Sequence, residues 1–172
     1  VITTNVPVLA PACEKLAVVA HENGTDFWVI VHRFGDNAFL SYLLTPGGLS
    51  SAPVQSNVGV PVTYGDAYAG YLCASVDGTM LAAAYPDVIN LVQVYDFDAA
   101  TGSVTNAITL NGFATQGLSS GIYGVEFSPS DDRLYLATTW ITSRLYQIDL
   151  TTSTLTQLQS IPGNYMLGAL QL

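Results

Sequence analysis

The sequence predicts an all-β fold made of repeated antiparallel sheets. Its apolar segments are short and rich in valine, isoleucine, threonine and aromatic residues, which fit the pleated surface of a strand. Turn-forming residues separate these segments about every eight to twelve positions. No long segment places apolar side chains at helical spacing, so the crossover helices of a parallel α/β fold are not expected.

A pattern of strand, tight turn and strand recurs three times along the chain. The three copies occupy residues 17–30, 71–83 and 124–137. Their turns contain Asn23, Asp77 and Asp131, which are spaced equally at 54 residues (77 − 23 and 131 − 77). Sheets that repeat every roughly 40–50 residues are typical of the blades of a β-propeller. The sequence therefore predicts propeller blades.

Each repeat unit is expected to form four antiparallel strands, a to d in chain order. In the third unit these strands are residues 124–128, 133–138, 144–150 and 154–160. Strands c and d are expected at 91–97 and 104–110 in the middle unit, and at 38–44 and 52–58 in the first. Asn-Gly, Asp-Gly and Thr-Gly pairs in the turns supply the positive φ angles that tight hairpins need.

These units define an N-terminal segment, residues 1–13, and an incomplete β-propeller, residues 14–172. The expected blades cover about 14–60, 68–112 and 122–161, and the first strand of a fourth covers 164–172. Because a closed propeller has at least about four blades, we expect the chain to be a piece of a longer protein. Its open blade faces are expected to pack against the remainder of that protein or against another copy of the chain.

Composition excludes several classes of partner. The chain has 13 acidic and 4 basic residues and a net charge of −9, so it lacks the basic surface that binds nucleic acid. The basic residues are Lys15, Arg33, Arg133 and Arg144. No apolar segment approaches the roughly 18 residues of a membrane-spanning helix, so no membrane insertion is expected. The mean hydropathy of +0.37 is high for a soluble domain and agrees with uncovered apolar faces.

Six segments of the chain resemble, in the same order, the WD40-like propeller region of large secreted surface proteins of gliding bacteria. The segments are residues 14–16, 21–32, 70–72, 123–129, 145–150 and 167–172. Proteins of that family carry a type IX secretion (gliding-motility-associated) sorting domain at their C-terminus. The resemblance implies a propeller fold and a secreted or cell-surface location, and it implies no particular activity or cofactor.

Two motifs could indicate catalysis. Residues 117–121 match the G-x-S-x-G pattern of a hydrolase nucleophile, but a strand rather than a helix is expected after Ser119, so the segment is interpreted as an inter-blade loop. His21 and His32 could form a metal or acid–base pair. The predicted hairpin instead separates them along its strands, with His21 opposite Asp26 at the turn.

Other residues allow binding interpretations beside structural ones. Asp96 and Asp98 could share a calcium ion, although the remainder of a calcium loop is missing and a plain turn is the alternative. Asn23 begins a glycosylation sequon that is equally a hairpin turn. Trp28, Trp140 and the ten tyrosines could form a carbohydrate platform or the core between blades. Cys13 and Cys73 could form a disulfide or remain thiols.

No catalytic residue or metal ligand is assigned from these motifs, and no cofactor is expected. The sequence is therefore interpreted as a non-catalytic interaction or scaffolding module whose ligand is unknown, with a protein or a glycan as the expected kind of partner. A lactonase-like propeller enzyme and a glycan-binding surface protein are the alternatives.

Overall fold

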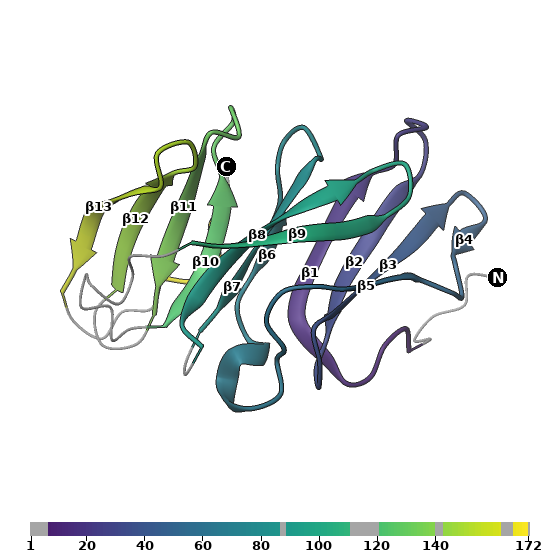
Figure 1. The fold of residues 1–172 in the computed structure, drawn as a ribbon, viewed down its shortest axis with the longest axis horizontal. Coiled ribbons are helices and arrows are strands. Elements are labelled where there is room, and N and C mark those ends of the chain that lie inside the picture. Colours follow the sequence, from purple (N-terminus) through teal and green to yellow (C-terminus); the bar gives the residue numbers. More distant parts are fainter. Residues whose placement is uncertain (1–6, 87–88, 111–120, 140–142, 163–166, 172) are drawn as a thin grey trace.

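The chain forms three antiparallel sheets that lie side by side like the leaves of a fan (Figure 1). The computed structural model describes residues 7–86, 89–110, 121–139, 143–162 and 167–171. The sheets are named blades 1, 2 and 3 in chain order. Each blade is a meander in which consecutive strands pair, because tight turns connect them. The predicted all-β fold with three repeated antiparallel units is confirmed, and the first unit contains one short strand beyond the four expected.

Blade 1 contains four long or medium strands and one short additional strand. They are β1 (Ala12–Ala20), β2 (Phe27–Arg33), β3 (Ala38–Thr45), β4 (Gly48–Leu49) and β5 (Val54–Asn57). Both β4 and β5 pair with β3. The two-residue strand β4 was not predicted, because the segment around it has the composition of a turn.

Blades 2 and 3 follow the predicted layout closely. Blade 2 consists of β6 (Leu72–Ala74), β7 (Met80–Tyr85), β8 (Leu91–Asp98) and β9 (Ser103–Leu110). Blade 3 consists of β10 (Ile122–Phe127), β11 (Arg133–Thr138), β12 (Ser143–Asp149) and β13 (Thr154–Ile161). The strand bounds expected for c and d of blade 2 and for all four strands of blade 3 differ from these by two residues at most. A short 3-10 helix, η1 (Gly65–Tyr68), lies in the crossover from blade 1 to blade 2 and was not predicted.

The first hairpins of blades 2 and 3 differ by one residue from the alignment made on sequence. Gly78 has a φ of 72° and lies two residues before β7, and Asp131 has a φ of 57° and lies two residues before β11. Asp131 is therefore the equivalent of Gly78 and not of Asp77. Aspartate tolerates this left-handed conformation better than most residues, which explains the substitution.

Blade 2 is buried on both faces because a blade covers it on each side. One face packs against blade 1 through Leu81, Ala83 and Tyr85, and the other packs against blade 3 through Ala82 and Ala84. These five consecutive residues of β7 are all 0% exposed. Their alternation between two cores follows from the period of two of a β-strand.

Trp28 belongs to the core between blades 1 and 2. Its side chain is buried, and its Nε1 donates a hydrogen bond of 2.9 Å to the carbonyl of Ala99 in the β8–β9 turn. A Cβ atom at Gly102 in the same turn would lie 2.8 Å from the indole ring. The core interpretation of Trp28 is confirmed, whereas Trp140 lies outside the described residues.

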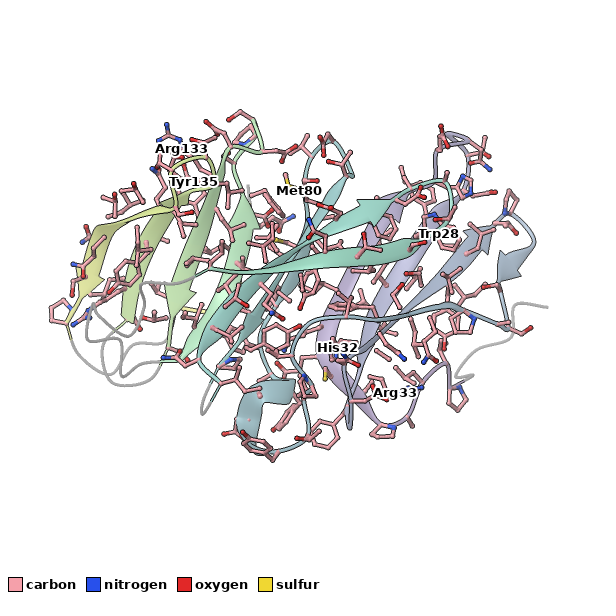
Figure 2. All side chains as sticks on the ribbon, viewed as in Figure 1. Trp28, His32, Arg33, Met80, Arg133 and Tyr135 are labelled. Carbon is pink, nitrogen blue, oxygen red and sulfur yellow. The ribbon has the colours of Figure 1, made fainter. Side chains whose placement is uncertain are left out.

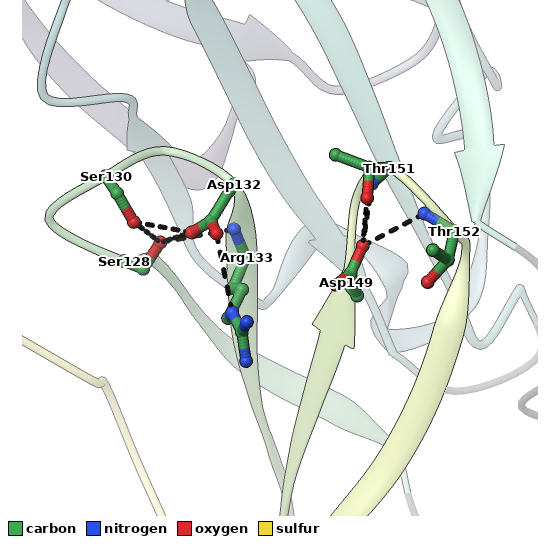
Figure 3. A network of polar contacts seen from close by, with 7 residues as sticks. All are labelled: Ser128, Ser130, Asp132, Arg133, Asp149, Thr151 and Thr152. Atoms are coloured by element: carbon green, nitrogen blue, oxygen red, sulfur yellow. Dashed lines mark hydrogen bonds and ion pairs between the residues drawn. The ribbon is translucent and has the colours of Figure 1, made fainter.

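Carboxylates organise the turns at the end of blade 3 that lies far from η1 (Figure 3). Asp149 accepts hydrogen bonds from the amides of Thr151 and Thr152, both of 2.9 Å, and these bonds, led by one from the Thr151 hydroxyl, lower its pKa to about 2. In the neighbouring turn, Ser128 donates to Asp132 at 3.0 Å. Both carboxylates therefore stabilise the turns in which they lie.

The segment 167–171 lies against the far face of blade 3. It forms no strand in the structure, and residues 164–166 and 172 of the expected fourth-blade strand lie outside the described residues. The amide of Leu167 donates to the Ser143 hydroxyl at 3.3 Å, and the carbonyl of Gly168 contacts Gly124 of β10 so closely that a side chain there would collide with it. The segment thus follows the position where the inner strand of a next blade would lie.

Candidate functional site

The starts of the inner strands of all three blades meet at one end of the fan. Each blade begins with its inner strand, so β1, β6 and β10 start at the same end, where η1 also lies (Figure 1). The Tyr71 amide donates to the Tyr123 carbonyl at 2.9 Å, and the Tyr123 hydroxyl donates to Glu14 of β1 at 3.1 Å. We call this end the channel mouth, because inner strands line the central channel of a propeller.

A pocket of about 390 Å³ opens at the channel mouth. It is lined by residues of η1, of the loops that follow β7 and β11, of β10 and of the C-terminal segment. These include Asp66, Tyr68, Pro86, Tyr123, Thr139 and Leu167. This mouth pocket combines tyrosine rings, an aliphatic wall, a hydroxyl and a carboxylate, and its volume suits a small ligand or one side chain of a partner.

Lys15 lies beneath the mouth pocket but does not face it. Its side chain is 0% exposed, and its Nζ donates to the carbonyls of Ala67 at 3.0 Å and Ala69 at 2.5 Å. The ammonium also lies 4.6 Å from the centre of the Tyr85 ring. Burial lowers the pKa of Lys15 to about 8. The ammonium therefore holds the η1 segment on blade 1 and is not accessible for direct contact with a ligand.

His32 and Cys13 form a buried pair near Lys15. Figure 2 shows where His32 lies, near Arg33. The His32 Nδ1 donates to the carbonyl of Arg33 at 2.9 Å, the Cys13 sulfur lies 3.6 Å from the same nitrogen, and His32 packs edge-on against Phe39. Burial lowers the pKa of His32 to about 4 and raises the pKa of Cys13 to about 11. Both groups are neutral at pH 7, so the pair lacks the thiolate of a cysteine nucleophile.

Of the three residues considered for catalysis, the structure describes His21 and His32, which belong to the β1–β2 hairpin. His21 lies at the β1–β2 turn, where its backbone amide bonds the Asp26 carbonyl at 2.9 Å as expected, whereas its imidazole accepts from the Asn23 amide. His21 and His32 lie at opposite ends of that hairpin. Ser119 lies outside the described residues.

The acidic and sequon candidates all belong to turns or strand ends. Asp96 accepts a hydrogen bond from Asn106 at 3.0 Å, and Asp98 accepts one from the Thr101 hydroxyl at 2.8 Å. Asn23 bonds the amides of its own turn. Among the described residues, no three His, Cys, Asp or Glu side chains gather as metal ligands. Both cysteines are thiols, which resolves the alternative left open by the sequence.

A second candidate surface is the outer face of blade 1. We call it the leading face, because the corresponding faces of blades 2 and 3 each pack against the preceding blade. Leu16 is 56% exposed, Val18 52% and Phe27 45%, and Leu44 and Leu49 continue the same face. On the leading faces of blades 2 and 3, the apolar residues are almost completely covered. Examples are Leu72, Leu81, Val125 and Leu134, of which none is more than 3% exposed.

No family model matches the chain, and no curated protein matches it. Solved structures share its fold. A luciferin-regenerating enzyme is 17% identical over 88% of this chain and 47% of its own, with a TM-score of 0.57. The β-propeller domain of Cps50 (Swd1) from Myceliophteria thermophila is 11% identical over 89% and 42%, with a TM-score of 0.52. The chain is a partial β-propeller.

The chain spans less than half the length of each solved structure named here. A candidate 6-phosphogluconolactonase from Bacteroides uniformis, for example, is 17% identical over 86% of this chain and 40% of its own, with a TM-score of 0.50. At such identities the likeness shows the fold alone. In the described part of the chain, no helix is long and apolar enough to cross a membrane.

Proposed function

We propose that the chain is a non-catalytic interaction or scaffolding module of a secreted or cell-surface bacterial propeller protein, of the gliding-motility type that its sequence resembles. The observation that carries this proposal is the exposed part of the leading face of blade 1, around Leu16, Val18 and Phe27. Further along the same face Tyr42 is buried, and its hydroxyl donates to the carbonyl of Val8 in the N-terminal segment. Contiguous apolar surface of this kind marks an interaction site in a folded protein. The covered leading faces of blades 2 and 3 indicate which partner fits it, namely the opposite face of another blade.

The chemistry of blade 3 favours further blades of the same longer protein over a second copy of the chain. On the outer face of blade 3, Glu126, Tyr135 and Gln147 lie in register across three strands. Leu170 of the C-terminal segment lies near the first two. This partly polar face is a poor match for Leu16 and its neighbours, since an unpaired carboxylate loses hydration when it is buried. A blade with small apolar residues, like those of β7, would fit.

The lactonase alternative has weaker support. A phosphorylated lactone would need a cationic group at the mouth pocket, and all four cationic residues, which are among the described residues, are engaged elsewhere. Lys15 binds carbonyls, Arg33 pairs with Asp36, Arg133 with Asp132, and Arg144 contacts Tyr146. The glycan-binding alternative rests on the exposed tyrosine rings at the channel mouth and is tested with the ligand series below.

The interaction surface is tested with Val18→Glu and, as a matched control, Ile108→Glu, which changes a 51% exposed residue on the outer strands of blade 2. In the chain alone, Val18→Glu should reduce the binding of a hydrophobic-surface dye more than Ile108→Glu does. Its free energy of unfolding should change by less than about 0.5 kcal/mol, as at a surface site. In a longer protein that contains the chain, Val18→Glu should cost about 3 kcal/mol or more, because a carboxylate would be buried.

Two results would contradict the proposal. One is a chain that binds no dye and loses several kcal/mol of stability on Val18→Glu, because that face would then be covered already. The other is turnover of a lactone panel that is abolished by Asp66→Asn, because it would place catalysis at the mouth pocket. Light scattering is a third measurement. A dimer that Val18→Glu abolishes would indicate that a second copy of the chain, rather than further blades, covers this face.

A further inference from the structure

We propose that the mouth pocket binds an organic cation: an ammonium or guanidinium group carried on a short apolar stem, such as a basic side chain of a partner protein. This site is distinct from the leading face of blade 1 and does not depend on the function proposed for that face. The inference rests on the rings, the charges and the hydrogen-bonding groups of the pocket.

Tyrosine rings supply the apolar part of the site. Tyr68 is 40% exposed and lines the pocket with Tyr123. Tyr71 contacts Tyr123 edge-to-face, with ring centres 5.6 Å apart, and so fixes the orientation of that ring. A cation over the face of a tyrosine is attracted by the electrons of the ring, and the stem of the ligand would pack on Pro86 and Leu167.

The charges at the channel mouth select for a positive ligand. Asp66 lines the pocket, and Glu14 lies at its edge, where it accepts the hydrogen bond from Tyr123. All four cationic residues of the chain are described, and the pocket lining contains none of them. Arg33, at the same end of the molecule, is paired with Asp36, and the buried Lys15 ammonium balances only one of the two carboxylates of the mouth. Phosphate esters and carboxylates would be repelled here.

The hydrogen-bonding groups distinguish a cation from a neutral sugar. A sugar hydroxyl both donates and accepts, so a sugar site needs donors as well as acceptors. At this mouth the strongest donors are already used, because Lys15 donates to the carbonyls of Ala67 and Ala69 and the Tyr123 hydroxyl donates to Glu14. The two carboxylates of the mouth only accept, and the Tyr68 and Thr139 hydroxyls, which line the pocket, can accept as well as donate. An ammonium or guanidinium group only donates, so it matches them.

The experiment titrates the chain with four small probes at constant ionic strength and follows amide shifts by NMR. The probes are n-butylammonium, methylguanidinium, methyl glucoside and glucose 6-phosphate. We expect saturable binding of both cations, with shifts centred on Tyr68 and Tyr123, and no saturable binding of the phosphate. Glu14→Gln and Asp66→Asn should each weaken cation binding by about three- to tenfold, the size of a charge-assisted contact at a partly exposed site.

Glu22→Gln is the matched control, because it removes another exposed carboxylate, in the β1–β2 turn at the end of the blade far from the mouth. It should leave cation binding within twofold of the unchanged chain. Equal weakening by Glu14→Gln and Glu22→Gln would show that only the net charge matters and would overturn the site. Saturable binding of the glucoside without the cations would establish a sugar site instead, and so would also overturn the proposal.

Discussion

His32 should make the fold sensitive to mild acid. Its imidazole is 0% exposed, its Nδ1 bonds a carbonyl, and its Nε2 has no hydrogen-bond partner among the described residues. Burial lowers its pKa from 6.5 in the unfolded chain to about 4. The unfolded state therefore binds one more proton than the folded state between these values, so stability is lost as the pH falls from 6.5 to 4.

The size of this loss follows from the shift. A difference of 2.5 pKa units (6.5 − 4) at about 1.36 kcal/mol per unit gives about 3 kcal/mol. Urea unfolding at several pH values measures it. His32→Leu should remove most of the pH dependence in this window, since leucine does not titrate and the unsatisfied nitrogen is gone. Burial raises the pKa of Glu126, so its titration has the opposite effect on stability from that of His32. The comparison of the unchanged chain with His32→Leu is therefore repeated with Glu126→Gln added to each.

Two outcomes would refute this reasoning. If the unchanged chain keeps constant stability between pH 6.5 and 4.5, the imidazole is not as buried as the structure shows. If His32→Leu retains the same slope, another group titrates. Cys13 and Lys15 do not interfere, because their folded pKa values are about 11 and about 8.

Three further predictions concern the turns and the packing between blades. Gly102→Ala should cost about 3 kcal/mol in urea unfolding, because φ is 77° and the new Cβ would collide with Trp28, whereas Gly24→Ala, with open space around it, should cost only about 1 kcal/mol. Asp131→Ala should cost about 1–2 kcal/mol, because its carboxylate bonds two backbone amides of the β6–β7 turn, and an unchanged stability would show that this bridge between blades contributes nothing. The Asp149 carboxyl should titrate near pH 2 by NMR, and a midpoint near 4 would mean that its turn hydrogen bonds are absent in solution.

The strands were predictable because their signals are local. The apolar pattern of a strand such as β11 can be found within the strand itself, and a pair such as Asp77-Gly78 before β7 marks a turn, so no distant contact is needed. The one-residue difference at Asp131 shows the limit of this reasoning. Asp77 and Asp131 match in residue type, whereas the structure aligns residues by backbone conformation, and there Asp131 corresponds to Gly78.

The mouth pocket was not predictable from the sequence, because its residues come from distant parts of the chain and have no common motif. The sequence around Tyr68 and around Tyr123 does not indicate that the crossover and β10 bring these two residues to the same pocket. Lys15 was interpreted as one of four scattered cations, and nothing local indicates that the carbonyls of Ala67 and Ala69 would enclose it. Sequence reasoning did place Trp28 correctly, because an aromatic residue on a strand of a repeated unit belongs in the core between units.

The three alanines of β7 determine how closely the blades approach one another. Ala82 and Ala84 face blade 3, Ala83 faces blade 1, and each contributes a single methyl group to a core that admits no solvent. A valine or leucine at one of these positions would act as a wedge and widen the angle between two blades. The same wedge would move Glu14 away from Tyr123, since these residues belong to the two outermost blades. The width of the channel mouth therefore depends on the smallest side chains of the middle blade.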